Sequence, residues 1–195
     1  MVDADSDVIT YTLSGGADVA LFEILDSSDG VVTFKVAPNF EALGSAASSN
    51  DYVIDVTATD DGAGALAVTQ TITISVTNVN EQPVITSSST FNQDENTVIS
   101  NAAADVTPTD PDGAGSFTHS IVGGVDSDKF TINSVTGQIF FVSTRNFEAP
   151  GSNAGNNAYV INVQVTDTTS ASNGELSSAI QTITITVMML TMPQQ

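Results

Sequence analysis

The sequence predicts an all-β protein made of two tandem Greek-key β-sandwiches, the first lacking its N-terminal strand. Three observations carry this expectation. Apolar and polar residues alternate with a period of two over long stretches, which is typical of strands with one buried face. No stretch offers a convincing apolar stripe at helical spacing. An internal repeat divides the 195 residues into two blocks of ordinary domain size.

The repeat is clearest at Asn39-Phe40-Glu41-Ala42, which recurs as Asn146-Phe147-Glu148-Ala149 at an offset of 107 residues. The same offset relates four further pairs, which are Asp3 and Asp110, Asp5 and Asp112, Tyr52 and Tyr159, and Asp60 and Asp167. Offsets of 108 and 111 at other shared motifs place small length differences in loops. We therefore expect a truncated repeat over residues 1–82, a complete repeat over 83–187 and a tail over 188–195.

Each block predicts the same series of strands. Shorter strands bounded by turn-favouring Gly, Asp, Asn and Ser are expected at 8–13, 20–24 and 31–36, and again at 117–121, 129–132 and 138–142. Longer alternating strands follow at 52–59 and 159–165. The final strands, 71–77 and 182–187, alternate threonine or serine with isoleucine or valine, which favours long β-branched strands.

The two blocks differ at their beginnings. The second has 27 residues, 83–109, before Asp110, whereas only Met1 and Val2 precede the equivalent Asp3. A sandwich without its opening strand exposes an unpaired edge, so we expect another copy of the chain, or the tail, to supply that strand. The tail carries three of the four methionines and resembles no ligand motif. Two roles are compatible with it: it could prolong the last strand, or it could contact a partner.

The charge balance limits the partners. Only three basic residues oppose 23 acidic ones, for a net charge of −20, which disfavours nucleic acid and anionic membranes. Solubility in a saline setting is one reading of this charge, and cation binding is the other. Cysteine is absent, which excludes disulfides and thiolate metal sites. No apolar run is long enough for direct membrane insertion, and we expect any export signal or anchor to lie outside this sequence.

Acidic residues recur at matching places in both blocks. Asp110 and Asp112 stand one residue apart before a strand, a spacing that lets both carboxylates reach one cation. Alone, such a pair is usually two ordinary turn aspartates, but the recurrence of the whole acidic set favours a metal role. Segment 78–83, between the blocks, adds a carboxylate, amide oxygens and a terminating proline. Hard oxygen ligands of this kind suit calcium.

Taken together, these motifs resemble the extracellular cadherin repeat, in the divergent form found in large bacterial surface proteins, over residues 3–187. The family's Asp-x-Asp is matched by Asp110 and Asp112, its Asp-Arg-Glu by Asn39 and Glu41, its Ala-x-Asp by Ala58-Thr59-Asp60, its Pro-Glu-Asn by Asp94-Glu95-Asn96 and its joint by residues 78–83. The resemblance implies an Ig-like, cadherin-like sandwich in each block.

The resemblance also implies calcium (Ca2+) bound between successive repeats. It implies as ligands Glu41, Asn80, Glu81, Asp110, Asp112 and Asp167, with Asn39, Asn78 and Gln82 as weaker candidates. The resemblance also implies two incomplete calcium sites. Asp3, Asp5 and Asp60 would complete an outer half-site with a preceding repeat, and Glu95 and Glu148 would do so with a following repeat. Asn39 and Asn146 replace a family aspartate, and Glu81-Gln82 replaces Asp-Asn, so fewer or more weakly bound ions are expected.

The leading hypothesis is a non-enzymatic, calcium-binding module of a bacterial cell-surface or secreted, membrane-associated adhesin. In this hypothesis the module is part of a larger exported protein, and calcium rigidifies the joint between the repeats. The alternatives are a calcium-dependent module for polysaccharide or for a like module on another chain, and an acidic spacer without specific ion binding. An enzyme is disfavoured, since His119 is the only histidine and lies on an expected strand, and no tryptophan is present to hold a sugar.

Overall fold

The computed structural model describes residues 7–113, 115–168 and 174–190. The protein divides into two compact units, Met1–Asn78 and Val79–Gln195, and the division falls inside the segment 78–83 that the sequence placed between the repeats. The domain limits expected from the repeat stay a prediction. Within the described ranges the regular elements are β-strands and three 3-10 helices, so the expected all-β class is confirmed.

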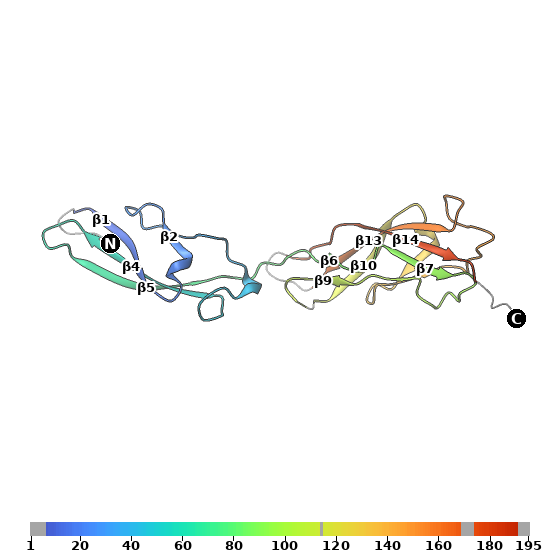
Figure 1. Ribbon diagram of the computed structural model, residues 1–195, viewed down its shortest axis with the longest axis horizontal. Coiled ribbons are helices and arrows are strands. Elements are labelled where there is room, and N and C mark those ends of the chain that lie inside the picture. Colours follow the sequence, from blue (N-terminus) through green and yellow to red (C-terminus); the bar gives the residue numbers. More distant parts are fainter. Residues whose placement is uncertain (1–6, 114, 169–173, 191–195) are drawn as a thin grey trace. The chain divides into compact units, whose positions relative to one another are not determined.

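The second unit contains two facing sheets and a short ribbon (Figure 1). The larger sheet has the order β10 (Phe117–Gly123), β13 (Ala158–Asp167), β14 (Gln181–Met188) and β7 (Thr90–Asp94). The smaller sheet has the order β11 (Phe130–Ile132), β12 (Gln138–Phe141) and β8 (Ala104–Asp105), and the ribbon pairs β6 (Val84–Ile85) with β9 (Pro108–Thr109). β7 runs parallel to β14, whereas the other pairs are antiparallel.

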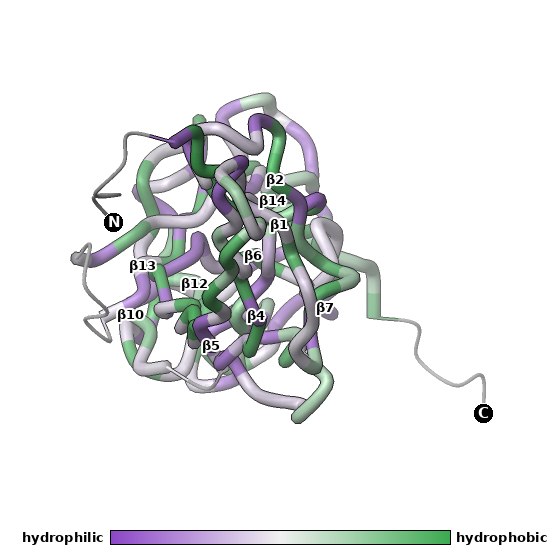
Figure 2. The backbone as a smooth tube through the Cα atoms, turned by 90° about the vertical axis from the view of Figure 1, so that its left-hand side faces the viewer, coloured by the Kyte–Doolittle hydropathy of each residue, from purple (hydrophilic) through white to green (hydrophobic). Residues whose placement is uncertain are grey.

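The core of the second unit follows from the alternation along its long strands. Every second residue of β13 is buried, from Tyr159 to Val165, and Ile183, Ile185 and Val187 of β14 lie on the same inner face. Ile139 and the Phe130–Phe141 ring pair cover this face from the smaller sheet. Burial of each such side chain stabilises the fold by about 1.5–3 kcal/mol. Figure 2 shows green apolar positions recurring along the strands between white and purple polar ones.

The first unit repeats this plan with fewer strands. One sheet has the order β1 (Ile9–Gly15), β4 (Asp51–Asp60) and β5 (Ala67–Ser75), and the other pairs β2 (Phe22–Ile24) with β3 (Val32–Phe34). Tyr52 and Ile54 of β4 are buried with Phe22, whereas the remaining core positions are only half-buried. The expected absence of an opening strand is therefore confirmed for residues 7–78.

Two expected strands begin later than the sequence indicates. Residues 20–21 and 129 belong to 3-10 helices, η1 (Val19–Leu21) and η3 (Ser127–Lys129), rather than to the strands that follow. The physical reason lies in Asp18 and Asp126, whose backbone N–H groups donate to the carbonyls of Val53 and Val160 and hold the chain in a turn. A third 3-10 helix, η2 (Phe40–Ala42), carries the Asn-Phe-Glu-Ala motif.

The tail belongs to the second unit as far as residue 190. Met188 ends β14 and pairs with Asp94 of β7, and the backbone N–H of Leu190 donates to Glu95 Oε1 over 3.0 Å. The expectation that the tail supplies a strand to the first unit is thus wrong for Met188 and Leu190, because Met188 pairs with β7 and the N–H of Leu190 donates to the Glu95 side chain, both within the second unit. Residues 191–195 lie outside the described ranges. Among the described helices, none has the length and hydropathy needed to cross a bilayer.

Candidate metal centre

The Asp110–Asp112 pair forms a tight turn directly after β9. The backbone N–H of Asp112 donates to Asp110 Oδ1 over 2.9 Å, and the N–H of Gly113 donates to the Asp110 carbonyl over 3.1 Å. This turn leaves one oxygen of each carboxylate, Asp110 Oδ2 and Asp112 Oδ1, buried without a hydrogen-bond partner. A buried anionic oxygen without a donor is costly, and a nearby cation would remove that cost.

The segment from Asn80 to Gln82 is hydrogen-bonded to Asp112 and to the part of the chain that follows β13. The backbone N–H of Glu81 donates to Asp112 Oδ2 over 2.9 Å. The Asn80 side chain is buried and donates through Nδ2 to the Gly174 carbonyl over 3.0 Å, and Gln82 Nε2 donates to the Ser177 carbonyl. The first of these bonds ties the segment to the Asp110–Asp112 turn, and the other two tie it to the part of the chain that follows β13.

Asp167 is the last residue of β13 and is buried. Its β-ladder partner is Phe117, the first residue of the strand that follows the Asp110–Asp112 turn. The N–H of Thr168 donates to the Ser116 carbonyl over 2.8 Å, which ties the end of β13 to the start of β10. Asp167, Asp110 and Asp112 therefore lie at the same end of the larger sheet.

These residues fit a hard divalent cation. The set contains carboxylate and amide oxygens, which calcium binds six to eight at a time, and it contains no thiolate or imidazole. A divalent ion would offset the repulsion among Glu81, Asp110, Asp112 and Asp167. It would also provide the partner that Asp110 Oδ2 and Asp112 Oδ1 lack among the protein donors.

The first-unit candidates lie on η2 and in the segment after β5. Asn39 is the N-cap of η2, and its Oδ1 accepts the backbone N–H of Glu41 over 2.8 Å. Asn146 makes the same bond with Glu148 in the second unit. This shared bond gives the asparagine a local capping role. Asn78 is the last residue of the first unit.

The half-site expected at the start of the chain is described only in part. Asp60 ends β4 as Asp167 ends β13, and its Oδ1 accepts the N–H groups of Gly62 and Leu66 over 3.2 and 3.0 Å. These bonds place its carboxylate in the turn that follows β4. Asp3 and Asp5 lie outside the described residues.

The half-site expected at the end of the chain is centred on Glu95. Its Oε1 accepts from Leu190 N–H, and its Oε2 accepts from Phe147 N–H over 3.1 Å and from Asn96 Nδ2 over 3.3 Å. Led by the bond from Leu190, these donors hold the pKa of Glu95 below its usual range. The Glu148 carboxyl lies close to that of Glu95, so the structure brings both glutamates together.

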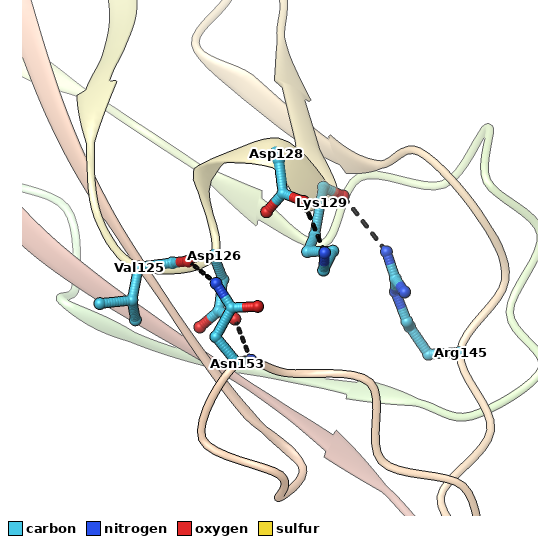
Figure 3. A network of polar contacts seen from close by, with 6 residues as sticks. All are labelled: Val125, Asp126, Asp128, Lys129, Arg145 and Asn153. Carbon is cyan, nitrogen blue, oxygen red and sulfur yellow. Dashed lines mark hydrogen bonds and ion pairs between the residues drawn. The ribbon is translucent and has the colours of Figure 1, made fainter.

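Sequence reasoning missed two buried carboxylates, Asp18 and Asp126. Asp126 accepts from the backbone N–H of Asn153 over 2.6 Å and from that of Val160 over 2.8 Å. In Figure 3 it lies beside Asn153, whose side chain also donates to the Val125 carbonyl. Asp18 repeats the arrangement with Ala46 and Val53. The offset of 108 that relates the two aspartates was the available signal.

Comparison with known proteins relates this chain to cadherins in both sequence and fold. The model of the cadherin domain matches residues 89–188. Human protocadherin Fat 1 is 31% identical over 135 residues, which make up 67% of this chain and 3% of that protein. The chain thus spans a small fraction of the length of this curated relative.

Solved cadherin structures share the fold over nearly the whole chain. Human protocadherin-24 EC1-2 (Form II) has a TM-score of 0.66 at 19% identity and covers 98% of this chain and 85% of its own. Drosophila N-cadherin EC1-4 has a TM-score of 0.70 at 18% identity, with 95% and 44% covered. Mouse cadherin-23 EC22-24 has a TM-score of 0.63 at 22% identity, with 96% and 57% covered. Given the domain match over half of its residues, this chain belongs to the cadherin family.

Proposed function

We propose that the second unit binds Ca2+ through Asn80, Glu81, Asp110, Asp112 and Asp167. The observation that carries this proposal is the pair of buried oxygens, Asp110 Oδ2 and Asp112 Oδ1, which have no hydrogen-bond partner. The bond from Glu81 N–H to Asp112 supports it, because it brings the Asn80–Gln82 segment to the same turn. Asp167 contributes a further carboxylate at this end of the sheet.

Glu41 of the first unit is proposed as a further ligand, with Asn39, Asn78 and Gln82 in weaker roles. Its support is the sequence repeat, which places Glu41 and Glu148 at equivalent positions of the two units. Both glutamates follow a capping asparagine in the same local geometry. A ligand from the first unit would stiffen the connection between the units when the ion is bound, which is the expected mechanical role of calcium here.

Cadherin domains are non-enzymatic, extracellular modules of the adhesion type and typically bind calcium. We propose that this chain serves in a cell-surface or secreted adhesin and makes contacts with like modules. The bacterial setting stays a prediction, and the polysaccharide alternative has no support in the comparisons. An acidic spacer without specific ion binding is the reading that the experiment below must exclude.

The test is calorimetric calcium titration and thermal melting of the wild type and of Asp112→Asn and Asp110→Asn. We expect saturable binding and a higher melting temperature, since a ligand specific for the native state at about 100 times its Kd adds about 2.7 kcal/mol of stability. Both substitutions should weaken binding. Asp105→Asn is the matched control because it removes one charge from an exposed residue on β8 and should leave binding unchanged.

Two results would count against the proposal. If sodium at equal ionic strength reproduces the whole effect of calcium, the chain is an acidic spacer. If Asp105→Asn weakens calcium binding as much as Asp112→Asn does, binding depends on the overall charge of the protein and not on the Asp110–Asp112 turn. Small-angle X-ray scattering in calcium and in chelator tests the stiffening, and curves that overlay would exclude it.

A further inference from the structure

The two units carry the same cluster of three aromatic rings. Phe130, Phe141 and Tyr159 form it in the second unit, and Phe22, Phe34 and Tyr52 form it in the first. The ring centres are separated by 4.3, 6.1 and 5.1 Å in the second unit and by 4.2, 6.1 and 5.1 Å in the first. Because the two clusters have the same internal geometry, the surroundings of one can be compared directly with those of the other.

In the second unit, Arg145 covers this cluster. Its guanidinium carbon lies 4.8 Å from the Phe141 ring centre and 5.3 Å from that of Tyr159. Its Nη2 donates to the Lys129 carbonyl over 3.4 Å (Figure 3), and a Cβ on Gly151 would lie 3.5 Å from its Nη1. Two rings, one carbonyl and a closely approaching glycine therefore hold the guanidinium.

Pro38 stands at the position of Arg145 in the first unit, 107 residues earlier. Proline has no cationic group, and a mainly apolar hollow of about 430 Å³ lies at this place. Its lining includes the counterparts of all four residues that contact Arg145, which are Leu21, Phe34, Gly44 and Tyr52. The first unit thus keeps the site for a guanidinium and lacks the side chain that fills it.

Leu21 corresponds to Lys129 through its backbone carbonyl. The Lys129 carbonyl accepts the N–H of Val142 over 2.9 Å as well as the guanidinium of Arg145. The Leu21 carbonyl accepts the N–H of Lys35, the counterpart of Val142, over 2.9 Å. A carbonyl oxygen has two lone pairs, so Leu21 can accept a second bond at the place that Arg145 uses in the second unit.

The hollow depends on one residue difference inside the repeat. The positions compared lie within 20–52 and 129–159, which correspond to each other throughout. The segment 83–109, by contrast, bonds to the backbone of Arg145 through the N–H of Asn96 and supplies none of the four contacts to the guanidinium. The difference between a filled site and an open one therefore follows from Pro38 in place of Arg145.

The charge of the first unit favours a cationic occupant. Within residues 7–78, ten acidic residues oppose one basic residue, Lys35. Lys35 lines the hollow, but its ammonium donates to the Ala20 carbonyl over 2.8 Å, and among the described residues Arg145 alone places a cation over an aromatic ring. A guanidinium is weakly hydrated and stacks on aromatic faces, so the acidic unit attracts it and the rings hold it.

We propose that this hollow of the first unit binds an arginine side chain of a partner polypeptide. The guanidinium lies over the Phe34 and Tyr52 rings and donates to the Leu21 carbonyl, in the geometry that Arg145 shows in the second unit. A second copy of the chain is a poorer occupant, because its one arginine, Arg145, is already held in its own second unit. The partner is a different, basic polypeptide, which the acidic surface also steers electrostatically.

The test is two-dimensional NMR of the full chain in chelator, titrated with N-acetyl-arginine amide. We expect chemical-shift changes confined to residues 20–21, 34–44 and 52, with saturation at roughly millimolar probe because a single cation–π site contributes little binding energy. N-acetyl-citrulline amide has nearly the same shape without the charge and should give no such changes. This pair of probes separates recognition of the guanidinium from general affinity for the apolar lining.

Variants locate the binding site. Pro38→Arg supplies an internal occupant and should weaken binding of the arginine probe by roughly tenfold or more, because a side chain of the same chain competes at high effective concentration. An unchanged spectrum away from residues 20–52 confirms that this variant is folded. Val135→Arg adds the same charge at an exposed position of the second unit and should leave binding unchanged. Lys35→Met removes a like charge beside the hollow while keeping the side-chain stem, and should strengthen binding.

Other outcomes overturn the proposal. Equal shifts with the arginine and citrulline probes would show that the hollow does not recognise the cation, and no shifts at the highest soluble probe concentration would show that it does not accept a guanidinium. Unchanged binding to Pro38→Arg would place the probe elsewhere on the acidic surface. Shifts of the same residues that grow with protein concentration, without probe, would show that a second copy covers the hollow. The absence of calcium keeps the result independent of the proposed metal centre.

Discussion

The backbone N–H of Asn153 donates to Oδ1 of Asp126 over 2.6 Å, and the N–H of Ala46 makes the equivalent bond to Asp18 over 2.6 Å. In both units a buried carboxylate thereby joins the turn before a short strand to the loop that precedes the longest strand. Asp126 is fully buried, and its second oxygen accepts from Val160. The repetition indicates that this bond is part of the basic construction of each unit.

Removing this carboxylate should destabilise the second unit. Asp126→Ala leaves the N–H groups of Asn153 and Val160 without their acceptors, and we expect a loss of about 2–4 kcal/mol in the free energy of unfolding. Urea unfolding in chelator measures it. Asp105→Asn, at an exposed position on β8, should stay within about 0.5 kcal/mol of the wild type. Equal stability of Asp126→Ala and the wild type would contradict the assigned role.

Glu95 should make stability depend on pH in the acidic range. Its folded pKa lies below the ordinary value of 4.5 because of the bonds from Leu190 and Phe147. It therefore contributes stability above the unfolded pKa, and this contribution is lost as the pH falls through the folded pKa. We expect Glu95→Gln to be less stable than the wild type at pH 7 and the difference to shrink towards pH 3. Urea unfolding in chelator measures both, and a difference independent of pH would be inconsistent with this account.

Arg145 should stabilise the second unit through its contact with aromatic rings. Its guanidinium carbon lies 4.8 Å from the Phe141 ring centre and 5.3 Å from that of Tyr159. We expect Arg145→Ala to lower the free energy of unfolding by about 1–2 kcal/mol, as measured by urea denaturation. Arg145→Lys keeps the charge but loses the planar group, so its free energy of unfolding should lie between those of the wild type and Arg145→Ala. If Lys and Ala are equally destabilising, the planar stacking is what matters; if neither is, the contact contributes nothing.

Two glycines provide a matched test of packing against backbone strain. Gly137 and Gly155 have similar positive φ angles of 76° and 70°, but a Cβ on Gly137 would lie 2.3 Å from the Val106 carbonyl oxygen, whereas one on Gly155 meets nothing within 4 Å. Gly155→Ala should cost about 1 kcal/mol from strain alone. Gly137→Ala should cost about 2 kcal/mol more, because the Val106 backbone must move. Thermal melting of both variants checks the difference, and equal costs would contradict the close approach.

Local patterns predicted most of the strands correctly. The period-two alternation at 52–59 and 159–165 matched β4 and β13, because a strand with one buried face imposes that period on its own sequence. The starts of β2 and β11 were expected too early. Their position depends on bonds from Asp18 and Asp126 to residues about thirty positions away, which no local pattern shows.

The candidate metal centre was predicted in part. The repeat singled out Asp110, Asp112 and Asp167, since equivalent positions carry the same residue types in both blocks. The bonds from Asn80 and Gln82 to Gly174 and Ser177 had no signal in the sequence, because they link side-chain amides to backbone carbonyls 94 and 95 residues away. Such contacts depend on how the loops after β13 fold against the segment that enters the unit.

The sequence by itself determined the all-β class and the internal repeat, because periodicity and turn residues are local properties of the chain and the repeat offset comes from comparing the chain with itself. Only the tertiary structure decided which carboxylate oxygens of Asp110 and Asp112 lack a hydrogen-bond partner, and which core positions of the first unit stay half-exposed. Burial and hydrogen-bond satisfaction are set by residues distant in sequence, so they are defined only once the sheets face each other.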